Sequence, residues 1–249
     1  KVELTDEGHV FLEQARLTIT QADKAVTMAR QVAAAKVQCL RIGFVPSAEI
    51  RIFPYILPRL RVKIPKLQIC TLNLKETDQI TELKKGDLDI IFINQDFQND
   101  TFASQLVLKE PLVFMLPKQH PFAKFEEIKL EQLKELELTI LSNKLSQPLS
   151  KTILQYIEFN KIQFKTIHET NHIVDCIQAV NSGVSCAILP SYMEALATDQ
   201  VIVKPLAKPL PSLDVFMAFN KNPPNQATEQ FLEEIRQVFA LDQFALYAS

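Results

Sequence analysis

LRIGFVPSAEIRIFPYILPRL, residues 40–60, joins the two kinds of element that decide the fold. It begins with the near-continuous apolar run of a buried strand, which stops at Pro46-Ser47. An apolar pattern with helical spacing follows over residues 53–62. Because open α/β sheets bind ligands at the carboxyl ends of their strands, the turn at Ser47 is either one wall of a binding site or an ordinary connection.

Strand and helix patterns alternate along the rest of the chain. Strands are predicted over residues 40–45, 67–72, 87–93, 112–117, 138–141, 164–167, 186–190, 201–206 and 213–219, and helices over residues 53–62, 77–85, 149–160, 173–181 and 228–239. Apolar runs separated by short amphipathic helices predict an α/β fold with parallel strands covered on both faces. This number of elements exceeds what one doubly wound sheet needs, which favours two similar lobes with a cleft between them. Crossovers near residues 110–112 and 212–213 would form the hinge.

Residues 5–36 contain no proline and many strong helix formers, with Thr5 well placed as N-cap. Apolar residues recur along this segment at spacings of three and four: Phe11, Ala15, Ile19, Ala22, Val26 and Ala29. At about 1.5 Å per residue the helix would be roughly 40 Å long or more. This narrow apolar seam predicts a dimerising linker helix, and the alternative is a long helix folded back on its own domain.

Composition limits the partners and the location of the protein. The 249 residues carry a formal net charge of −2, so no global positive field is available to hold nucleic acid. DNA binding would need a local patch or a segment absent here, and a start in mid-pattern without an initiator methionine suggests a fragment. With no export signal and no apolar run of about 18 residues, the sequence predicts a cytoplasmic protein without membrane contact.

Catalytic motifs are missing from the sequence. It contains neither G-x-S-x-G, G-x-x-x-x-G-K-[ST], G-x-G-x-x-G nor H-E-x-x-H, and 4 glycines disfavour a phosphate cradle built from glycine amides. His168 and His172 have the spacing of two metal ligands on one helix, but they fall at a strand end and a helix start, which favours polar loop or pocket-lining roles. We therefore expect no catalytic residue, no metal and no cofactor.

The four cysteines show neither C-x-x-C spacing nor a dense framework, which indicates reduced, mostly buried thiols. They are Cys39, Cys70, Cys176 and Cys186. The alternative is redox sensing through Cys176 and Cys186.

Small or polar residues stand at several junctions from a predicted strand to a predicted helix: Ser47, Ala48, Thr77, Asn94, Ser142 and Asn143. Hydroxyl and amide groups there can bind a carboxylate together with the free N–H groups of a helix N-terminus. The alternative is that they only cap helices. Because several strand ends converge on one crevice in such sheets, we expect the group to line a ligand site.

Five segments occur in this order: LTDEGHVFLEQARLTITQADKA (4–25), LRIGFVPSAEIRIFPYILPRLRVKIPKLQICTL (40–72), LKKGDLDIIFI (83–93), KEPLVFMLPKQHPFA (109–123) and AVNSGVSCAILPSYM (179–193). Together they resemble the linker helix and effector-binding domain of LysR-type transcriptional regulators. The resemblance implies the fold of type 2 periplasmic binding proteins, in which two Rossmann-like subdomains hold a small inducer in their cleft. It also implies a winged helix-turn-helix domain before residue 4.

The resemblance implies a division of the chain. Residues 1–38 would be the end of the wing and the linker helix, residues 39–110 and 213–249 subdomain I, and residues 111–212 subdomain II. The implied partners are a small organic inducer, promoter DNA through the N-terminal domain, further copies in a homodimer or homotetramer, and RNA polymerase.

The resemblance also assigns roles to single residues. Ser47 matches the position that commonly bonds the inducer carboxylate or its water, and Thr77 matches a residue that lines the same site. Asn94 stands where some relatives that bind muconate or benzoate have an arginine, which implies different ligand chemistry. Ser142 and Asn143 fall at the junction of the facing subdomain.

Two runs, GFVPSAE (43–49) and PLPSLDVFMAF (209–219), look most like regulators of phenylpropionate or cinnamate catabolism, which implies an aromatic acid as inducer. Four phenylalanines could form an apolar wall for its ring, and the alternative for each is ordinary core packing: Phe44, Phe53, Phe92 and Phe97. One departure from the family is Ser185, which replaces a usual glycine and puts the local backbone path in doubt. The alternative function is a solute-binding protein for transport of a small organic acid.

Overall fold

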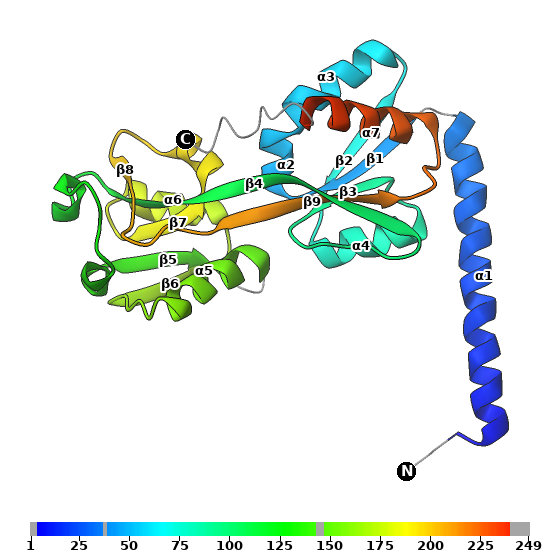
Figure 1. Cartoon of the computed structure of the whole chain (residues 1–249), viewed down its shortest axis with the longest axis horizontal. Coiled ribbons are helices and arrows are strands. Elements are labelled where there is room, and N and C mark those ends of the chain that lie inside the picture. Colours follow the sequence, from blue (N-terminus) through cyan, green and yellow to red (C-terminus); the bar gives the residue numbers. More distant parts are fainter. Residues whose placement is uncertain (1–3, 37–38, 143–146, 240–249) are drawn as a thin grey trace.

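A computed structural model describes residues 4–36, 39–142 and 147–239 (Figure 1). The helices are α1 (Asp6–Lys36), α2 (Pro46–Arg51), α3 (Phe53–Lys63), α4 (Glu76–Lys85), α5 (Gln147–Phe159), α6 (Ile173–Asn181) and α7 (Gln226–Phe239). The strands are β1 (Cys39–Phe44), β2 (Gln68–Asn73), β3 (Ile90–Ile93), β4 (Phe102–Pro117), β5 (Glu137–Leu141), β6 (Thr166–Thr170), β7 (Cys186–Pro190), β8 (Val201–Lys204) and β9 (Ser212–Asn220). Three short 3-10 helices among the described residues are η1 (Pro121–Lys124), η2 (Leu130–Glu135) and η3 (Ser191–Leu196). Each strand and helix predicted from the sequence overlaps one of these elements.

The strands follow the order β2-β1-β3-β9-β4-β7-β5-β6, with β8 also paired to β4. β1 is parallel to β2 and β3, and β5 is parallel to β6 and β7, as predicted. The prediction is wrong in the middle of the path, where β9 is antiparallel to both β3 and β4. It is also wrong for the edge strands β2 and β6, whose residues are mostly exposed. The fold is therefore a mixed α/β arrangement.

The first half of the fold is built around β1, β2 and β3, with α2, α3, α4 and the C-terminal α7. In it, β1 and β3 lie between two layers of helices (Figure 1). Ile90 and Phe92 of β3 face a core shared with α2, α3 and α7. Ile91 and Ile93 face the opposite way, into a smaller core against α4. Successive side chains of a strand point to opposite faces, so a strand that is covered on both sides must be apolar at every position.

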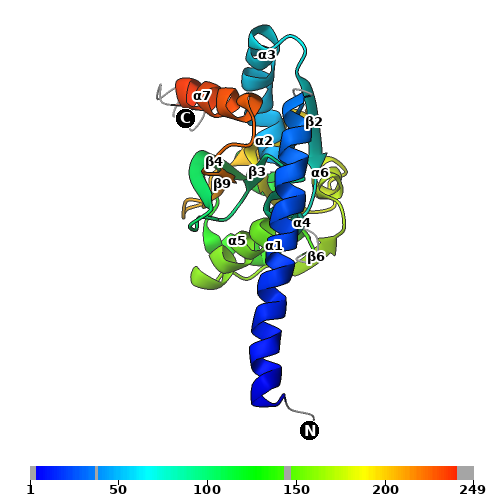
Figure 2. The ribbon, with the colours of Figure 1, turned by 90° about the vertical axis from the view of Figure 1, so that its right-hand side faces the viewer.

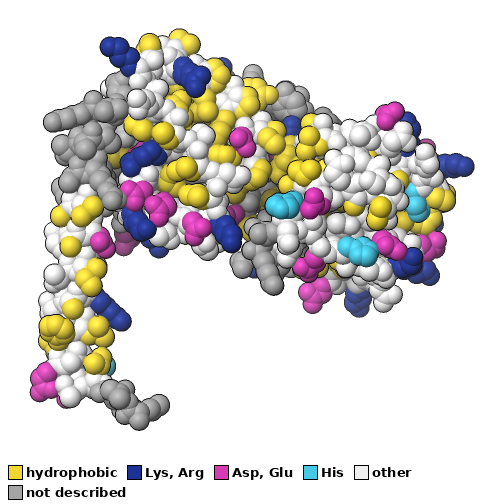
Figure 3. Space-filling view, turned by 180° about the vertical axis from the view of Figure 1, so that it is seen from behind, with side chains coloured by type: hydrophobic (Ala, Val, Ile, Leu, Met, Phe, Trp, Pro, Cys, Tyr) yellow, Lys and Arg dark blue, Asp and Glu magenta, His cyan; other side chains and the backbone are white. Residues whose placement is uncertain are grey.

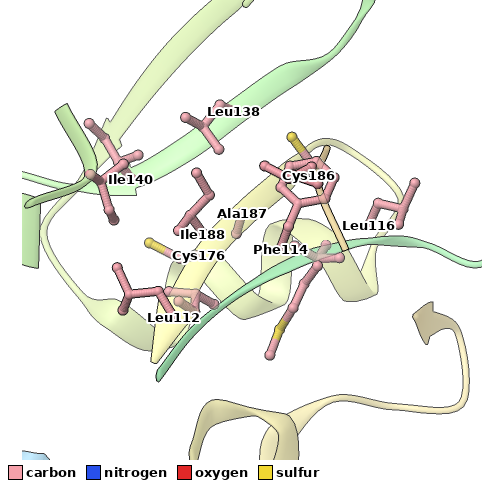
Figure 4. Close-up of a cluster of buried hydrophobic side chains, with 14 of the residues drawn as sticks. Leu112, Phe114, Leu116, Leu138, Ile140, Cys176, Cys186, Ala187 and Ile188 are labelled. Carbon is pink, nitrogen blue, oxygen red and sulfur yellow. The ribbon is translucent and has the colours of Figure 1, made fainter. Parts of the chain in front are cut away.

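The second half of the fold has a core of its own (Figure 4). Phe114 of β4, Leu138 of β5 and Ile188 of β7 are fully buried in it, beside the thiols of Cys176 and Cys186. α6 packs against β5 and β7 of this half. The β5–β6 and β5–β7 ladders therefore form a second α/β layer structure around a separate cluster.

β4 joins the two halves. Residues Phe102–Pro111 pair with β9, whereas residues Leu112–Met115 pair with β7. The sequence predicted only residues 112–117 of this strand. Its earlier part escaped notice because Gln105 and Leu106 are exposed and the pairing register shifts between Leu106 and Leu108, which breaks the apolar alternation.

Ser185, the departure from the family pattern, has a partner in the core. Its hydroxyl lies 2.7 Å from the Thr139 hydroxyl, and both side chains are buried. Gly183 keeps the left-handed backbone, with φ of 75°, that the turn before β7 requires. The backbone path is therefore retained without the second glycine.

α1 is a single long helix beside the first half, and its N-terminal part extends past the rest of the protein (Figures 1 and 2). The predicted cap is confirmed, because the Gly8 N–H donates to the Thr5 hydroxyl at 3.2 Å. Within the predicted seam, Phe11, Ile19 and Val26 are 75%, 62% and 50% exposed, and apolar side chains line the helix in Figure 3. Among the described residues, no helix is long and apolar enough to cross a membrane.

The alanines of the predicted seam differ in exposure. Ala22 is exposed and Ala15 is partly buried, while the Ala29 side chain lies outside the described part of the helix. α1 contacts α4. The exposed apolar residues face solvent in the isolated chain, so the folded-back alternative does not account for them.

Candidate functional site

The site begins at the turn after β1. Val45 has extended backbone, Pro46 occupies the first turn of α2, and the next two residues are buried, with Ser47 3% and Ala48 0% exposed. The Ala48 N–H donates to the Val45 carbonyl at 2.9 Å. The prediction of free N–H donors at this turn is therefore wrong for Ala48, and α2 is a helix of only 6 residues. The Ser47 hydroxyl remains as the polar group of the turn.

Tyr192 of η3 meets Ser47 from the second half of the fold. Its side chain is buried, and it lies close enough to the Ser47 side chain for that hydroxyl to lower its pKa. Burial raises the pKa of the Tyr192 hydroxyl, the negative charge of Glu110 raises it further, and the Ser47 hydroxyl acts in the opposite direction. The Ser47 hydroxyl of one half and the Tyr192 hydroxyl of the other therefore lie close together at this point.

Glu110 holds the first turn of η3. Its carboxylate is 0% exposed and lies where β4 is about to leave β9 for β7. Oε1 accepts hydrogen bonds from the Ser191 hydroxyl at 2.8 Å and from the Tyr192 N–H at 3.2 Å. A buried carboxylate needs such donors because its desolvation is costly.

Arg51, the last residue of α2, supplies the opposite charge. Its Nε lies 3.5 Å from Glu110 Oε2, and its Nη2 donates to the Ser191 hydroxyl at 2.8 Å. Among the described residues, Oε2 accepts no hydrogen bond, so this ion pair is what compensates it. Three segments distant in sequence thus converge: α2, the end of the β4–β9 pairing, and η3.

The next two predicted site residues follow β2 and β3, the strands on either side of β1. Thr77 is exposed on α4, and its hydroxyl lies 3.5 Å from the Asp78 carboxylate. Asn94 follows β3: its N–H donates to Glu76 Oε1 and its side-chain amide donates to the Asp214 carbonyl, both at 2.8 Å. Burial raises the pKa of Glu76, and the Asn94 N–H partly opposes this shift. The Asn94 side chain is thereby committed to β9.

In the second half, Ser142 follows β5 and is buried. Its N–H donates to the Thr170 carbonyl at 2.8 Å, which extends the β5–β6 ladder by one bond. Ser150 of α5, which sequence reasoning missed, donates to the Leu141 carbonyl at 2.5 Å at the same strand end. Asn143 lies outside the described residues.

The phenylalanines considered for an apolar wall are core residues. Phe44, Phe53 and Phe92 are buried and form edge-to-face pairs at centroid distances of 5.3 and 5.7 Å. Phe97 packs elsewhere, 5.7 Å from the ring of Phe102. The core-packing alternative therefore describes all four in this structure.

The two histidines also have separate surroundings. His168 lies on β6, where Nε2 is 3.0 Å from Glu137 Oε2, and His172 precedes the first turn of α6. Within the described ranges, no group of three or more His, Cys, Asp or Glu residues could hold a metal ion.

Comparison with known proteins identifies the fold that this geometry belongs to. Residues 36–240 match the family described as LysR substrate binding domain. The chain belongs to this family. The LysR domain is 29% identical over 240 residues to the Hca operon transcriptional activator HcaR of Escherichia coli (strain K12), covering 96% of this chain and 81% of HcaR.

Two further comparisons involve BenM, an HTH-type transcriptional regulator of Acinetobacter baylyi (strain ATCC 33305 / BD413 / ADP1). The LysR domain is 21% identical to it over 245 residues, 98% of this chain and 80% of BenM. The structure of the BenM effector-binding domain with its effector benzoate superposes with a TM-score of 0.72 at 20% identity, covering 83% of this chain and 94% of that one. LysR effector-binding domains have the type 2 periplasmic-binding-protein-like fold, as expected.

Sequence reasoning singled out Ser47 in the LysR domain but not the residues that surround it in the structure, which are Arg51, Glu110, Ser191 and Tyr192. The sequence does contain one signal for this set: Glu110 is a single carboxylate between the apolar runs LVL and PLVFML, at the predicted crossover. A carboxylate that is buried between such runs is normally paired with a cation, so its position indicates that a partner exists. The identity of its partners could not be predicted, because α2 and η3 are about 140 residues apart in the chain, as the separation of Arg51 and Ser191 shows.

Proposed function

We propose that this LysR domain is the effector-sensing part of a transcriptional regulator and binds a small carboxylate, preferably an aromatic one, beside Ser47. The supporting observation is the buried Ser47 hydroxyl at the carboxyl end of β1, where it meets Tyr192 of the other half. Ligands of open α/β folds gather at such strand ends. The preference for an aromatic acid follows from similarity to regulators such as BenM, whose domain was solved with benzoate.

We further propose that residues 39–110 and 213–249 form one subdomain and residues 111–212 the other. Support comes from the buried clusters: one contains residues between Leu112 and Leu206 together with Leu213 at the boundary, whereas the others draw on the remaining strands and helices. β4 changes its partner from β9 to β7 after Pro111. An effector that contacts both subdomains would favour one relative orientation of them.

In the regulator we propose, α1 pairs with the α1 of another copy in a homodimer or homotetramer. It links the sensing domain to a winged helix-turn-helix domain that binds promoter DNA in the cytoplasm, and the bound regulator contacts RNA polymerase. The exposed apolar residues of α1 support the pairing, because a face of this kind is normally covered.

Ser47→Ala tests the effector site. Benzoate and 3-phenylpropionate are each added to the protein, and affinity is measured by calorimetry alongside the melting temperature, which a ligand of the folded state raises. We expect the wild type to bind at least one of them, and Ser47→Ala to bind it about tenfold more weakly, because a hydrogen bond to a charged group is lost.

Ser185→Ala is the matched control. It removes another buried serine hydroxyl, whose partner is the Thr139 hydroxyl. Ser185 directly precedes β7, whereas η3 follows the other end of that strand. It should bind the acids as the wild type does. A wild type that binds neither acid, or a Ser47→Ala variant with unchanged affinity, would contradict the proposed site.

A further inference from the structure

The contact between Ser47 and Tyr192 leaves a donor to spare. Each hydroxyl carries one proton, and a hydrogen bond between the two side chains would use only one of the two protons. The remaining O–H can donate to a third group. An anionic oxygen is the acceptor that gains most from it, because hydrogen bonds to charged groups are the stronger ones.

Tyr192 is held in place by a set of contacts that Ser47 does not make. Glu110 Oε1 accepts from the Tyr192 N–H at 3.2 Å and from the Ser191 hydroxyl at 2.8 Å, which fixes the start of η3 to β4. Because the Glu110 side chain is fully buried on a strand, it is a rigid point of attachment. The Tyr192 ring is therefore positioned by the crossover strand.

α2 is attached to η3 at both of its ends. Ser47 in its first turn meets Tyr192, and Arg51 at its last residue donates to the Ser191 hydroxyl at 2.8 Å and lies 3.5 Å from Glu110. Residues four apart lie on one face of a helix, so the same face of α2 makes both contacts. Moving η3 away from α2 would separate the two hydroxyls and break the Arg51–Ser191 hydrogen bond together.

We propose that Tyr192 is a second effector-binding residue, which shares the effector carboxylate with Ser47 across the two halves, and that Glu110, Ser191 and Arg51 are its positioning residues. The inference rests on the proposed function and deepens it. Ser47 alone could bind an effector to one half. Ser47 and Tyr192 together make binding depend on how the halves are placed.

Tyr192→Phe tests the contact, because it removes the hydroxyl and keeps the ring. Affinities for benzoate and for benzamide, an uncharged analogue of similar shape, are measured by calorimetry. We expect benzoate to bind about tenfold more weakly to Tyr192→Phe than to the wild type, with a smaller loss for benzamide. A general loosening of the structure would instead weaken both ligands equally.

Tyr156→Phe is the matched control. The Tyr156 hydroxyl of α5 donates to the Lys208 carbonyl at 2.7 Å, so the variant loses one hydroxyl and one hydrogen bond without touching Ser47. Its affinity for benzoate should equal that of the wild type. A Tyr192→Phe variant that binds benzoate as the wild type does overturns this inference alone, whereas a wild type that binds no aromatic acid overturns the proposed function.

The positioning residues are tested by Ser191→Ala and by charge changes at the ion pair. Ser191→Ala keeps both charges and should still lower the preference for benzoate over benzamide. Arg51→Gln should lower it further, and Arg51→Gln combined with Glu110→Gln should recover part of it, because no unpaired charge is then left buried.

Arg59→Gln serves as the control for charge, since Arg59 lies on α3 and its side chain is 58% exposed. It should leave the ligand preference unchanged. If Ser191→Ala and the Arg51 variants alter the melting temperature but not the ratio of benzoate to benzamide affinity, Glu110, Ser191 and Arg51 have a structural role only and the positioning role is refuted.

Discussion

The four thiols differ because each meets a different amount of water. Cys70 is exposed on the edge strand β2, and Cys39 is half-buried near it. Burial, and then the neighbouring Cys70, raises the pKa of Cys39. Burial raises the pKa of Cys176 to about 12, and that of Cys186 even more. The prediction of mostly buried thiols therefore holds for Cys176 and Cys186 only.

Thiol labelling with an aromatic disulfide reagent at pH 8 should follow this order. Cys70 should react first and Cys39 more slowly, while Cys176 and Cys186 react only after unfolding, because the thiolate is the reactive form and a raised pKa keeps it scarce. Mass spectrometry of the labelled peptides identifies each site. Rapid labelling of Cys176 or Cys186 in the folded protein would revive the redox-sensing alternative.

At the scale of elements, α1 was the easiest to predict and β4 the hardest. The 3.6-residue periodicity of α1 is local, so sequence reasoning found both its ends within a residue or two. β4 depends on pairing with β9 more than 100 residues later in the chain, as the match of Phe102 to Asn220 shows. Nothing within residues 102–111 carries that information.

The same reasoning explains which site residues could be predicted. Ser47 follows a strand that its own apolar run identifies, so its place was readable from a few neighbours. Tyr192 becomes relevant only because β7 lies beside β4, and Glu110 only because β4 carries it past α2. Positions were therefore predictable and partners were not, since partners are set by the topology of the sheet.

Ile19→Glu tests the seam of α1. The side chain is 62% exposed, so a charge there should leave the helix folded but disrupt pairing with another α1. Light scattering after size exclusion should show a dimer or tetramer for the wild type and a smaller species for the variant. Val62→Glu, at an 81% exposed position of α3, should keep the mass of the wild type.

Two outcomes would count against the linker role of α1. A monomeric wild type would favour the solute-binding alternative, which shares the fold and needs no partner. An Ile19→Glu variant with the mass of the wild type would place the assembly surface elsewhere.

At the scale of the whole molecule, the two halves of the fold share two strands. β9 pairs with β3 in the first half, and β4 pairs with β9 before it pairs with β7 in the second. If the first half unfolds, β9 loses its pairing with β3. The β4–β9 ladder, which leads into the second half, then loses its support on that side. We therefore expect the halves to unfold together.

Phe231→Ala tests this coupling. Phe231 of α7 is 0% exposed in the first core, with its ring centroid 6.2 Å from that of Phe92, so its truncation should cost about 3–5 kcal/mol. Urea should then expose Cys176 and Cys186, in the other core, at a lower concentration than in the wild type. Phe159→Ala, at an 87% exposed position, should have little effect. An unchanged midpoint for Cys176 and Cys186 in Phe231→Ala would show that the halves unfold independently.

The contacts of Asn94 constrain how such a sensor can change its ligand over evolution. The amide group that fastens the end of β3 to the Asp214 carbonyl is also the group that a new anion-binding side chain would have to replace. A single substitution to arginine would offer a guanidinium and remove this hydrogen bond to β9 in one step. New specificity at this position is therefore expected to cost stability that a second substitution restores, whereas the exposed Thr77 can vary alone. Divergence of effector choice should be slower at position 94 than at position 77.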